Sequence, residues 1–336
     1  MVDTVLTEAL LQAGLRNDFA GTYDPIYAGI LENLGPIADL SVPSNKRTET
    51  YGYFESSPSP GIWNRGEAIS ESGYDSVNYS VTNFNWGHRI RWHQDDREDD
   101  QTQSLFRRAR DTATKMARLD ERIFFQVLLN ATDVRLLQAI PLAPDGAAWF
   151  AATANSVDRF GVSGGNILTG AASSGIASVS AIQTDFFTAL GRFKQFQDTD
   201  DEPLLDDSAI EAGATILYGA GGGRDEVFKK AFNAQLILES NASNSAAGVS
   251  NAILAVGMGN TNVRSTSRIT TDDWFIILHG TTLKPFFKQN RRSITEAVSN
   301  KGNSDNARDL GEEYIQWDFR AGYSLNIPYQ SIQVDN

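Results

Sequence analysis

Residues 51–100 decide the fold, and they read YGYFESSPSPGIWNRGEAISESGYDSVNYSVTNFNWGHRIRWHQDDREDD. A strand-like run over residues 48–54 leads into this stretch, and residues 56–75 follow with two prolines, three glycines and little periodicity. A second strand-like run, residues 77–92, has its apolar side chains first at odd and then at even positions. Because successive side chains of a strand point to opposite faces, this change predicts a bulge or bend near residues 82–83.

Together the two runs predict a long two-stranded excursion with a loose tip. A lone hairpin is marginal in water, so we expect it to find support on another surface, that of a partner subunit. Its aromatic residues and one arginine are the candidates for contacts between subunits: Tyr51, Tyr53, Phe54, Trp63, Arg65 and Trp86.

A long helix should follow this hairpin. After an acidic cluster at residues 95–100, apolar residues recur every three or four positions from Leu105 to Val127. The pattern predicts one amphipathic helix over about 101–130, about 45 Å long at roughly 1.5 Å per residue. The acidic residues suit the positive end of its dipole.

The N-terminal segment combines a helical pattern with helix breakers. Residues 3–20 predict a short helix that Gly21, Asp24 and Pro25 interrupt. Residues 26–45 contain two further prolines and two further glycines, and they predict an extended segment. Such an arm needs a surface on which to lie.

The second half of the chain mixes helices and strands. A capping-box spacing at Ser180–Gln183 predicts a helix start, and residues 214–218 predict a buried strand before a glycine run and another helix. Small polar residues over 241–250 predict a mobile loop, and strands are expected at 274–279 and 315–327. The fold class is therefore α+β.

Composition narrows the function classes. The net charge of −13 makes the average surface repel phosphate, which argues against a dedicated DNA-binding protein but suits a container that encloses nucleic acid without gripping it. With no cysteine, disulfides, thiolate catalysis and cysteine metal sites are excluded. We find no apolar run of about 18 residues and no secretory signal, so we expect no membrane span and folding in the cytoplasm.

Two glycine-rich motifs match catalytic loops only in part. Gly219–Arg224 lies between an expected strand and helix, but its last glycine comes too early for a dinucleotide fingerprint and no Gly-Lys-Ser/Thr is present. Residues 161–165 match Gly-x-Ser-x-Gly, yet the segment after them is not helical. Only His88, His93 and His279 could serve as the base. A flexible loop is the favoured reading of the first motif, and a serine hydrolase is disfavoured.

The sequence supports a cofactor site or a metal site no better than it supports a catalytic loop. The acidic clusters at 95–100 and 198–207 lack the glycine and spacing of a calcium loop. The aromatic residues have few basic neighbours, so core or subunit packing is favoured over stacking on bases. We expect no catalytic residue, no cofactor and no metal site, and the chain is not predicted to be an enzyme.

The order of these features resembles a known family. Residues 51–100, followed by LDERIFFQVLLNA at 119–131, are similar to the Mu-like major head subunit family of phage major capsid proteins. The shared order is a Tyr-Gly-aromatic strand, a loop with proline and tryptophan, a strand ending in acids, and a helix ending in Asp-Glu-x-Ile-Phe. Residues 284–287 and 314–329 also look similar, so the resemblance covers most of the chain.

This resemblance implies the Hong Kong 97-type phage capsid fold, an α+β fold with an N-arm, an extended E-loop hairpin, a long spine helix, and peripheral and axial domains. It implies the following division: 1–45 N-terminal arm, 46–94 E-loop, 95–180 spine helix and peripheral domain, 181–265 axial domain, and 266–336 return to the peripheral domain.

The function implied is that of a major capsid protein that assembles into hexamers and pentamers of an icosahedral shell around phage double-stranded DNA. A separate scaffold protein and a portal are the implied partners, decoration proteins stay open, and the location is the virion after assembly in the host cytoplasm. One alternative is an encapsulin-like nanocompartment, which shares the fold but encloses cargo protein. The alternative from another class is a nucleotide-binding enzyme that uses Gly219–Arg224.

Overall fold

The structure is a computed structural model of the 336-residue chain. It describes residues 8–54, 76–93, 95, 104–131, 133–137, 140–171, 178–233, 236–240, 246–251, 253, 261–299 and 304–336. Within them the α-helices are α1 (Glu8–Leu34), α3 (Ser104–Ala117), α4 (Leu119–Leu128), α5 (Val179–Phe193), α6 (Asp207–Glu211), α7 (Arg224–Asn233) and α9 (Asp305–Asp309).

The strands of the described residues form five separate sheets. A four-stranded sheet, named here the long sheet, has the order β1 (Ala38–Pro43), β13 (Phe286–Ser299), β14 (Glu312–Leu325), β4 (Phe84–His93). A five-stranded sheet has the order β11 (Asn262–Thr266), β8 (Ala214–Gly219), β12 (Trp274–Leu278), β15 (Ser331–Asp335), β7 (Ile167–Thr169). Three two-stranded sheets are β2 (Thr48–Phe54) with β3 (Ser76–Thr82), β9 (Leu236–Ser240) with β10 (Ala246–Ser250), and β5 (Thr153–Ala154) with β6 (Val157–Asp158).

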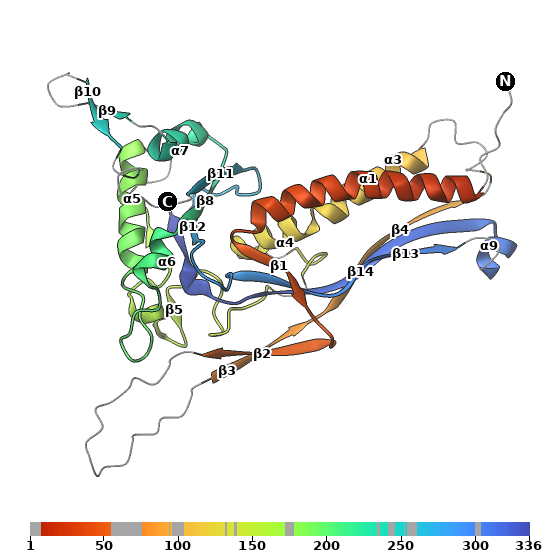
Figure 1. The fold of residues 1–336 in the computed structure, drawn as a ribbon, viewed down its shortest axis with the longest axis horizontal. Coiled ribbons are helices and arrows are strands. Elements are labelled where there is room, and N and C mark those ends of the chain that lie inside the picture. The colour runs from red at the N-terminus through yellow and green to blue at the C-terminus, as the bar shows by residue number, and fades with distance from the viewer. Residues whose placement is uncertain are drawn as a thin grey trace, which may run out of the picture.

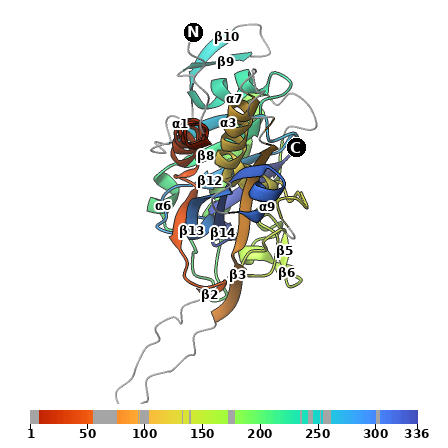
Figure 2. The same cartoon turned by 90° about the vertical axis from the view of Figure 1, so that its right-hand side faces the viewer.

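The molecule has an elongated half and a thicker half (Figure 1). In the elongated half, α1 and α3 lie side by side along one face of the long sheet. The β2–β3 hairpin contacts β13 and β14 at its base and projects below the long sheet (Figures 1 and 2). In the thicker half, α5 and α7 stand beside the five-stranded sheet. These two halves are called below the long-sheet half and the five-stranded half.

Three hydrophobic clusters hold these layers together. One lies between the five-stranded sheet and the pair α5 and α7. A second joins the opposite face of that sheet to α4, the C-terminal part of α1 and the inner ends of β13 and β14. The third packs the N-terminal part of α1 and α3 onto β4 and β14. The five-stranded sheet is thus covered on both faces.

The prediction of a bend near residues 82–83 is confirmed. β3 ends at Thr82, β4 begins at Phe84, and the buried Asn83 lies between them. Its side-chain amide donates to Ser44 Oγ at 2.7 Å and to the Lys46 carbonyl at 2.8 Å. These bonds compensate the lost ladder pairing and fix the direction in which the hairpin leaves the sheet.

The prediction for the N-terminal arm was wrong for residues 21–34, whereas residues 38–43 are extended as predicted and form β1. α1 continues to Leu34 with Pro25 inside it. An internal proline costs a helix about 3 kcal/mol. Large apolar side chains at helical spacing are buried along the full length of α1, and each is worth roughly 1.5–3 kcal/mol. These side chains are Leu11, Leu15, Phe19, Ile30 and Leu34. Their combined burial outweighs the cost of the proline.

The single helix expected over 101–130 is two helices. α3 and α4 meet at Arg118, whose ψ of 2° departs from helical geometry. The buried side chains of α3 belong to the cluster above the long sheet, whereas those of α4 belong to the cluster that reaches the five-stranded sheet. The break at Arg118 therefore lets each helix face its own core.

Three further expectations need correction. α5 is capped by Ser178, whose Oγ accepts the Ala181 N–H at 3.1 Å, and not by Ser180. The loop expected at 241–250 was wrong for residues 246–250, which form β10 with β9, while 241–245 lie outside the described residues. The strand β13 was not anticipated, because its outer part, QNRRSITEA, mixes charged and apolar residues without a clear alternation.

Candidate assembly surface

The part of the β2–β3 hairpin nearest the long sheet, residues 48–51 and 79–82, is called here the hairpin foot. It is bonded to other parts of the same chain. Tyr51 stacks on Tyr79 across the hairpin and meets the edge of Phe287 on β13. The Tyr51 hydroxyl donates to Gln289 Oε1 at 2.9 Å, and Gln289 Nε2 donates to the Val81 carbonyl at 2.9 Å. Tyr51 therefore anchors the hairpin to the long sheet.

A turn before β2 strengthens this foot. The Glu49 carboxylate accepts the backbone N–H groups of Asn45 and Lys46, both at 2.9 Å. These backbone hydrogen bonds are the main reason that the pKa of Glu49 lies below its ordinary value. The root of the hairpin is therefore built with a defined geometry.

The other sequence candidates lie in different surroundings. Tyr53 is half-buried near the outer end of β2, and Phe54 is the last residue of that strand. Trp63 and Arg65 lie outside the described residues. Trp86 is half-buried on β4, where its indole N–H donates to the Ala321 carbonyl at 3.0 Å and its ring meets Tyr323 edge-on. The structure brings Trp86 against β14, where it also lines a groove together with the end of β3.

An apolar groove lies beside the hairpin foot. Its volume is about 720 Å³, and it runs between the β3–β4 junction and the loop of residues 134–146. Large hydrophobic side chains exposed in it are Phe84 at 44%, Leu142 at 54% and Val134 at 82%. Clustered exposed apolar side chains of this kind mark surfaces that partners cover. No local sequence pattern reveals this groove, because its two walls are more than 40 residues apart in the chain.

A buried ion pair joins the helices to the long sheet. Lys288 of β13 donates to Asp120 of α4 at 2.7 Å, and both side chains are almost inaccessible. The hydroxyls of Tyr323 and Tyr27 donate to the same carboxylate at 2.5 Å and 3.2 Å. Burial and, secondarily, the Asp120 charge raise the pKa of Tyr323 well above its ordinary value, so it stays a donor. The Asp120 carboxylate thus links four elements, namely α1, α4, β13 and β14.

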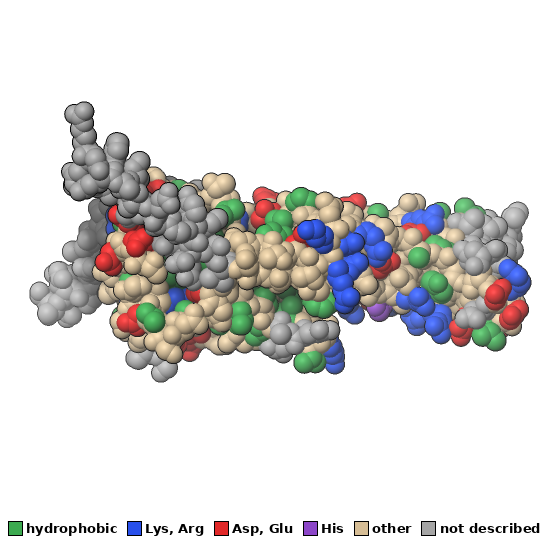
Figure 3. All heavy atoms as spheres, turned by 90° about the horizontal axis from the view of Figure 1, so that it is seen from below, with side chains coloured by type: hydrophobic (Ala, Val, Ile, Leu, Met, Phe, Trp, Pro, Cys, Tyr) green, Lys and Arg blue, Asp and Glu red, His purple; other side chains and the backbone are tan. Residues whose placement is uncertain are grey.

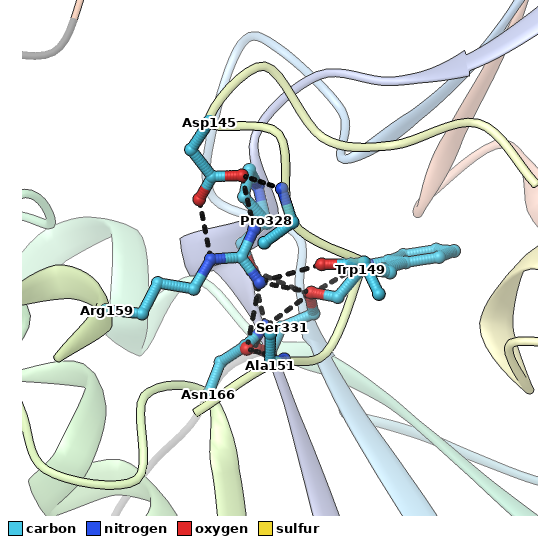
Figure 4. A network of polar contacts seen from close by, with 9 residues as sticks. Asp145, Trp149, Ala151, Arg159, Asn166, Pro328 and Ser331 are labelled. Atoms are coloured by element: carbon cyan, nitrogen blue, oxygen red, sulfur yellow. Dashed lines mark hydrogen bonds and ion pairs between the residues drawn. The ribbon is translucent and has the colours of Figure 1, made fainter. Parts of the chain in front are cut away.

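A second buried network holds the loop that crosses the five-stranded half (Figure 4). The Arg159 guanidinium makes two hydrogen bonds to the Asp145 carboxylate, at 2.7 Å and 3.0 Å, and also donates to the Trp149 carbonyl. The fully buried Asn166 side chain donates to the carbonyls of Trp149, Pro328 and Ser331. This network joins the loop of residues 145–166 to β15, the last strand of the chain. The polar groups named here are all used in hydrogen bonds within the protein.

The two motifs with possible catalytic meaning have structural roles. Residues 161–165 begin at the last residue of the 3₁₀ turn Arg159–Gly161 and contain a turn with Gly164 and Gly165 at positive φ. The strand and helix of a nucleophile elbow are therefore missing there. In the other motif, the buried Arg224 guanidinium donates to the backbone carbonyls of Thr271 and Asp272. A Cβ at Gly219 would lie 2.6 Å from the Ile269 carbonyl oxygen, so close backbone packing explains that glycine.

Within the part of the chain that the structure describes, no three His, Cys, Asp or Glu side chains are grouped so as to hold a metal ion. None of the described helices combines the length and apolar character needed to cross a bilayer.

The comparisons with known proteins identify the fold. No protein-family model matches the chain, and no curated protein does. Solved structures do match. The capsid of the cyanophage P-SCSP1u has a TM-score of 0.54 at 9% identity, covering 88% of this chain and 86% of that one. The capsid of the native GTA particle has a TM-score of 0.54 at 13% identity, with 90% of both chains covered. The capsid of Myoviridae phage XM1 has a TM-score of 0.53 at 9% identity, again with 90% of both covered.

Because these matches extend over nearly the whole of each chain, this protein has the α+β, Hong Kong 97-type fold of phage capsid proteins. The fold predicted from the order of sequence motifs is confirmed. The finer resemblance to the Mu-like family stays a prediction.

Proposed function

We propose that this chain is a major capsid protein of a tailed phage, which assembles into hexamers and pentamers of an icosahedral shell around double-stranded DNA. The observation that carries the proposal is the end-to-end likeness to capsid subunits. A projecting hairpin with an exposed apolar groove at its foot is what a subunit needs to bind its neighbours.

The proposal gives the parts of the chain their roles. Residues 1–45 would be the N-terminal arm, 46–94 the E-loop, 95–180 the spine helices and peripheral domain, 181–265 the axial domain, and 266–336 the return to the peripheral domain. The E-loop would lie on a neighbouring subunit. A separate scaffold protein and a portal would take part in assembly in the host cytoplasm, and the mature protein would reside in the virion.

Negative-stain microscopy of the protein, expressed alone and with its neighbouring genes, tests the proposal. Closed shells, or hexamers and pentamers, are the expected result. Shells that carry double-stranded DNA would support a phage head, and shells that carry a cargo protein but no DNA would support an encapsulin-like compartment instead. A monodisperse monomer under every condition would contradict the proposal.

In that last case the loop Gly219–Arg224 would need testing as a nucleotide site. Its arginine is engaged with backbone carbonyls, so we expect the melting temperature not to change on adding nucleotides. A clear rise in melting temperature would favour the enzyme alternative.

The E-loop assignment has its own test. Replacing Tyr53 and Trp63 by alanine should leave a soluble subunit whose yield of shells falls strongly, because aromatic anchors contribute most where a partner desolvates them. Tyr314→Ala on β14 removes an aromatic ring far from the hairpin foot and serves as the control. An unchanged shell yield in the double variant would show that the hairpin is not an interface.

A further inference from the structure

The two helices α3 and α4 carry a row of cations on their outer surface. The apolar side chains of α3 face the long sheet, and they include Leu105, Ala109 and Ala113. At about 100° per residue, the opposite surface of the helices bears five exposed basic side chains. This row, named here the helix stripe, consists of Arg107, Arg108, Lys115, Arg118 and Arg122.

Within the described ranges, four of these five cations form no ion pair. Arg122 pairs with Asp133 at 2.6 Å. Among the described residues, none forms an ion pair with the other four members of the stripe. The one carboxylate within the same surface of α3 is Asp111. In a chain with a net charge of −13, such a concentration of unpaired positive charge points to an anionic partner.

The opposite face of the long sheet differs. Seen from below, basic side chains also gather over the elongated half (Figure 3). Here carboxylates of the same face compensate two of the arginines, with Arg91 paired to Glu312 and Arg292 paired to Asp318. These two arginines therefore stabilise the sheet itself, and less of their charge is available to a partner.

The helix stripe is bordered by two polar grooves. One, of about 230 Å³, lies between α3 and the edge strand β4, and Arg108 and Lys115 line it. The other, of about 720 Å³, lies between α1 and α4, and Arg118 and Arg122 line it. The distance along the helices from Arg108 to Arg122 is about 21 Å at roughly 1.5 Å per residue. The positive surface is thus long and narrow.

We infer that the helix stripe binds the phosphate backbone of the enclosed DNA, so that the surface of α3 and α4 lines the interior of the shell. This inference rests on the proposed function. A row of cations about 21 Å long suits a linear polyanion. Arginine is well suited to phosphate, and the exposed stripe offers no aromatic ring on which bases could stack. The contact would therefore be independent of sequence.

A competing partner is the acidic turn of a second copy. In the turn of residues 198–202, Asp198 accepts the backbone N–H groups of Asp200 and Glu202, which leaves several carboxylates exposed. This turn is compact, so it would cover only part of the stripe. Charge complementarity over the full length favours DNA, and the experiments below separate the two partners.

The first experiment measures DNA binding by unassembled capsomers. The triple variant Arg108→Gln, Lys115→Gln, Arg118→Gln is compared with Lys194→Gln, Lys229→Gln, Lys230→Gln, which changes the net charge equally on the five-stranded half. The probe is a short fluorescent DNA duplex, titrated at several salt concentrations. If each cation meets one phosphate, the slope of log K against log salt becomes shallower by about 2.7 in the stripe variant.

The control variant should keep the original slope. An unchanged slope in the stripe variant, or no binding by the unmodified capsomers at low salt, would overturn the inference. If the stripe variant binds DNA normally but no longer forms shells, the stripe is a contact between subunits, which also overturns it.

The second experiment asks which side of the shell the stripe faces. The chain has no cysteine, so Asp111→Cys places a single thiol inside the stripe. A polymer-linked maleimide too large to enter the shell should label this thiol only after the shells are opened. Thr295→Cys, an exposed position on β13, serves as the control. Labelling of Asp111→Cys in closed shells would refute the interior position, while failure to form any shell would instead count against the proposed function.

Discussion

The two halves of the molecule bury their sheets in different ways. In the five-stranded half, every residue of β8 and β12 is buried, because helices and loops cover both faces. In the long-sheet half, β14 alternates between half-buried and buried residues over most of its length, because α1 and α3 cover one face only. Except for the parallel edge strand β1, the strands of the long sheet pair antiparallel. Antiparallel strands can leave one face to water or to a partner.

This difference suggests that one half mainly stabilises the subunit and the other mainly binds partners. The five-stranded half has a complete core and should account for most of the stability of the isolated subunit. The long-sheet half carries the hairpin foot, the apolar groove and the helix stripe, which are the surfaces that our proposals assign to partners. If the comparison holds, substitutions in the core of the five-stranded half should cost more stability than substitutions in the long-sheet half.

The largest loss of stability is expected from Trp274→Ala. Trp274 is fully buried in the five-stranded half and meets the ring of Phe228 edge-on at 5.4 Å. Removing a buried indole should lower the free energy of unfolding by roughly 5 kcal/mol, the upper end for such substitutions. Chemical denaturation of the soluble subunit measures this. A loss below about 1 kcal/mol would mean that this half is not the stability core.

A somewhat smaller loss is expected from Asp120→Asn in the region where the two halves meet. The substitution leaves the Lys288 ammonium buried without a counter-charge, and removing one member of a buried ion pair costs about 3 kcal/mol or more. The double variant Asp120→Leu, Lys288→Met removes both charges and should recover much of the loss. A double variant as unstable as the single one would show that the tyrosine hydrogen bonds, and not the ion pair, carry the effect.

A modest loss is expected from Phe19→Leu in the long-sheet half. Phe19 lies between α1 and β14, with its ring stacked on Trp317 at 4.3 Å. Leucine keeps most of the apolar contact, so the free energy of unfolding should fall by about 1 kcal/mol. A fall as large as that of Trp274→Ala would contradict the contrast between the halves.

The smallest effect is a change in pH dependence at Asp185 in α5. Burial is the main cause that raises the pKa of this carboxyl, although it accepts the Ala171 N–H at 2.8 Å. Because the folded state holds the proton more tightly than the unfolded state, this group stabilises the fold at low pH and loses that contribution as the pH rises through the folded pKa. Asp185→Asn should remove this decline and slightly stabilise the subunit at neutral pH. Thermal melting across the acidic range provides the measurement.

Local patterns in the sequence predicted a large part of the fold. The change of face near Asn83, the buried strand of residues 214–218 and the amphipathic pattern from Leu105 to Val127 all depend on neighbouring residues, so they were found without any tertiary information. The row of apolar residues from Leu11 to Leu34 was also visible in the sequence. Its second half was not predicted as helix, because Pro25 is normally a helix breaker.

The sequence alone therefore determined most of the strands and helices, though not β13, β10 or the full length of α1, and the order of those segments was enough to predict the capsid fold. Only the tertiary structure decided which faces are covered and which charges meet. Asp120 and Lys288 are 168 residues apart, and the hydrogen bond between Asn166 and Ser331 spans 165. No local period encodes such pairs, because they form only when distant elements pack together and exclude water.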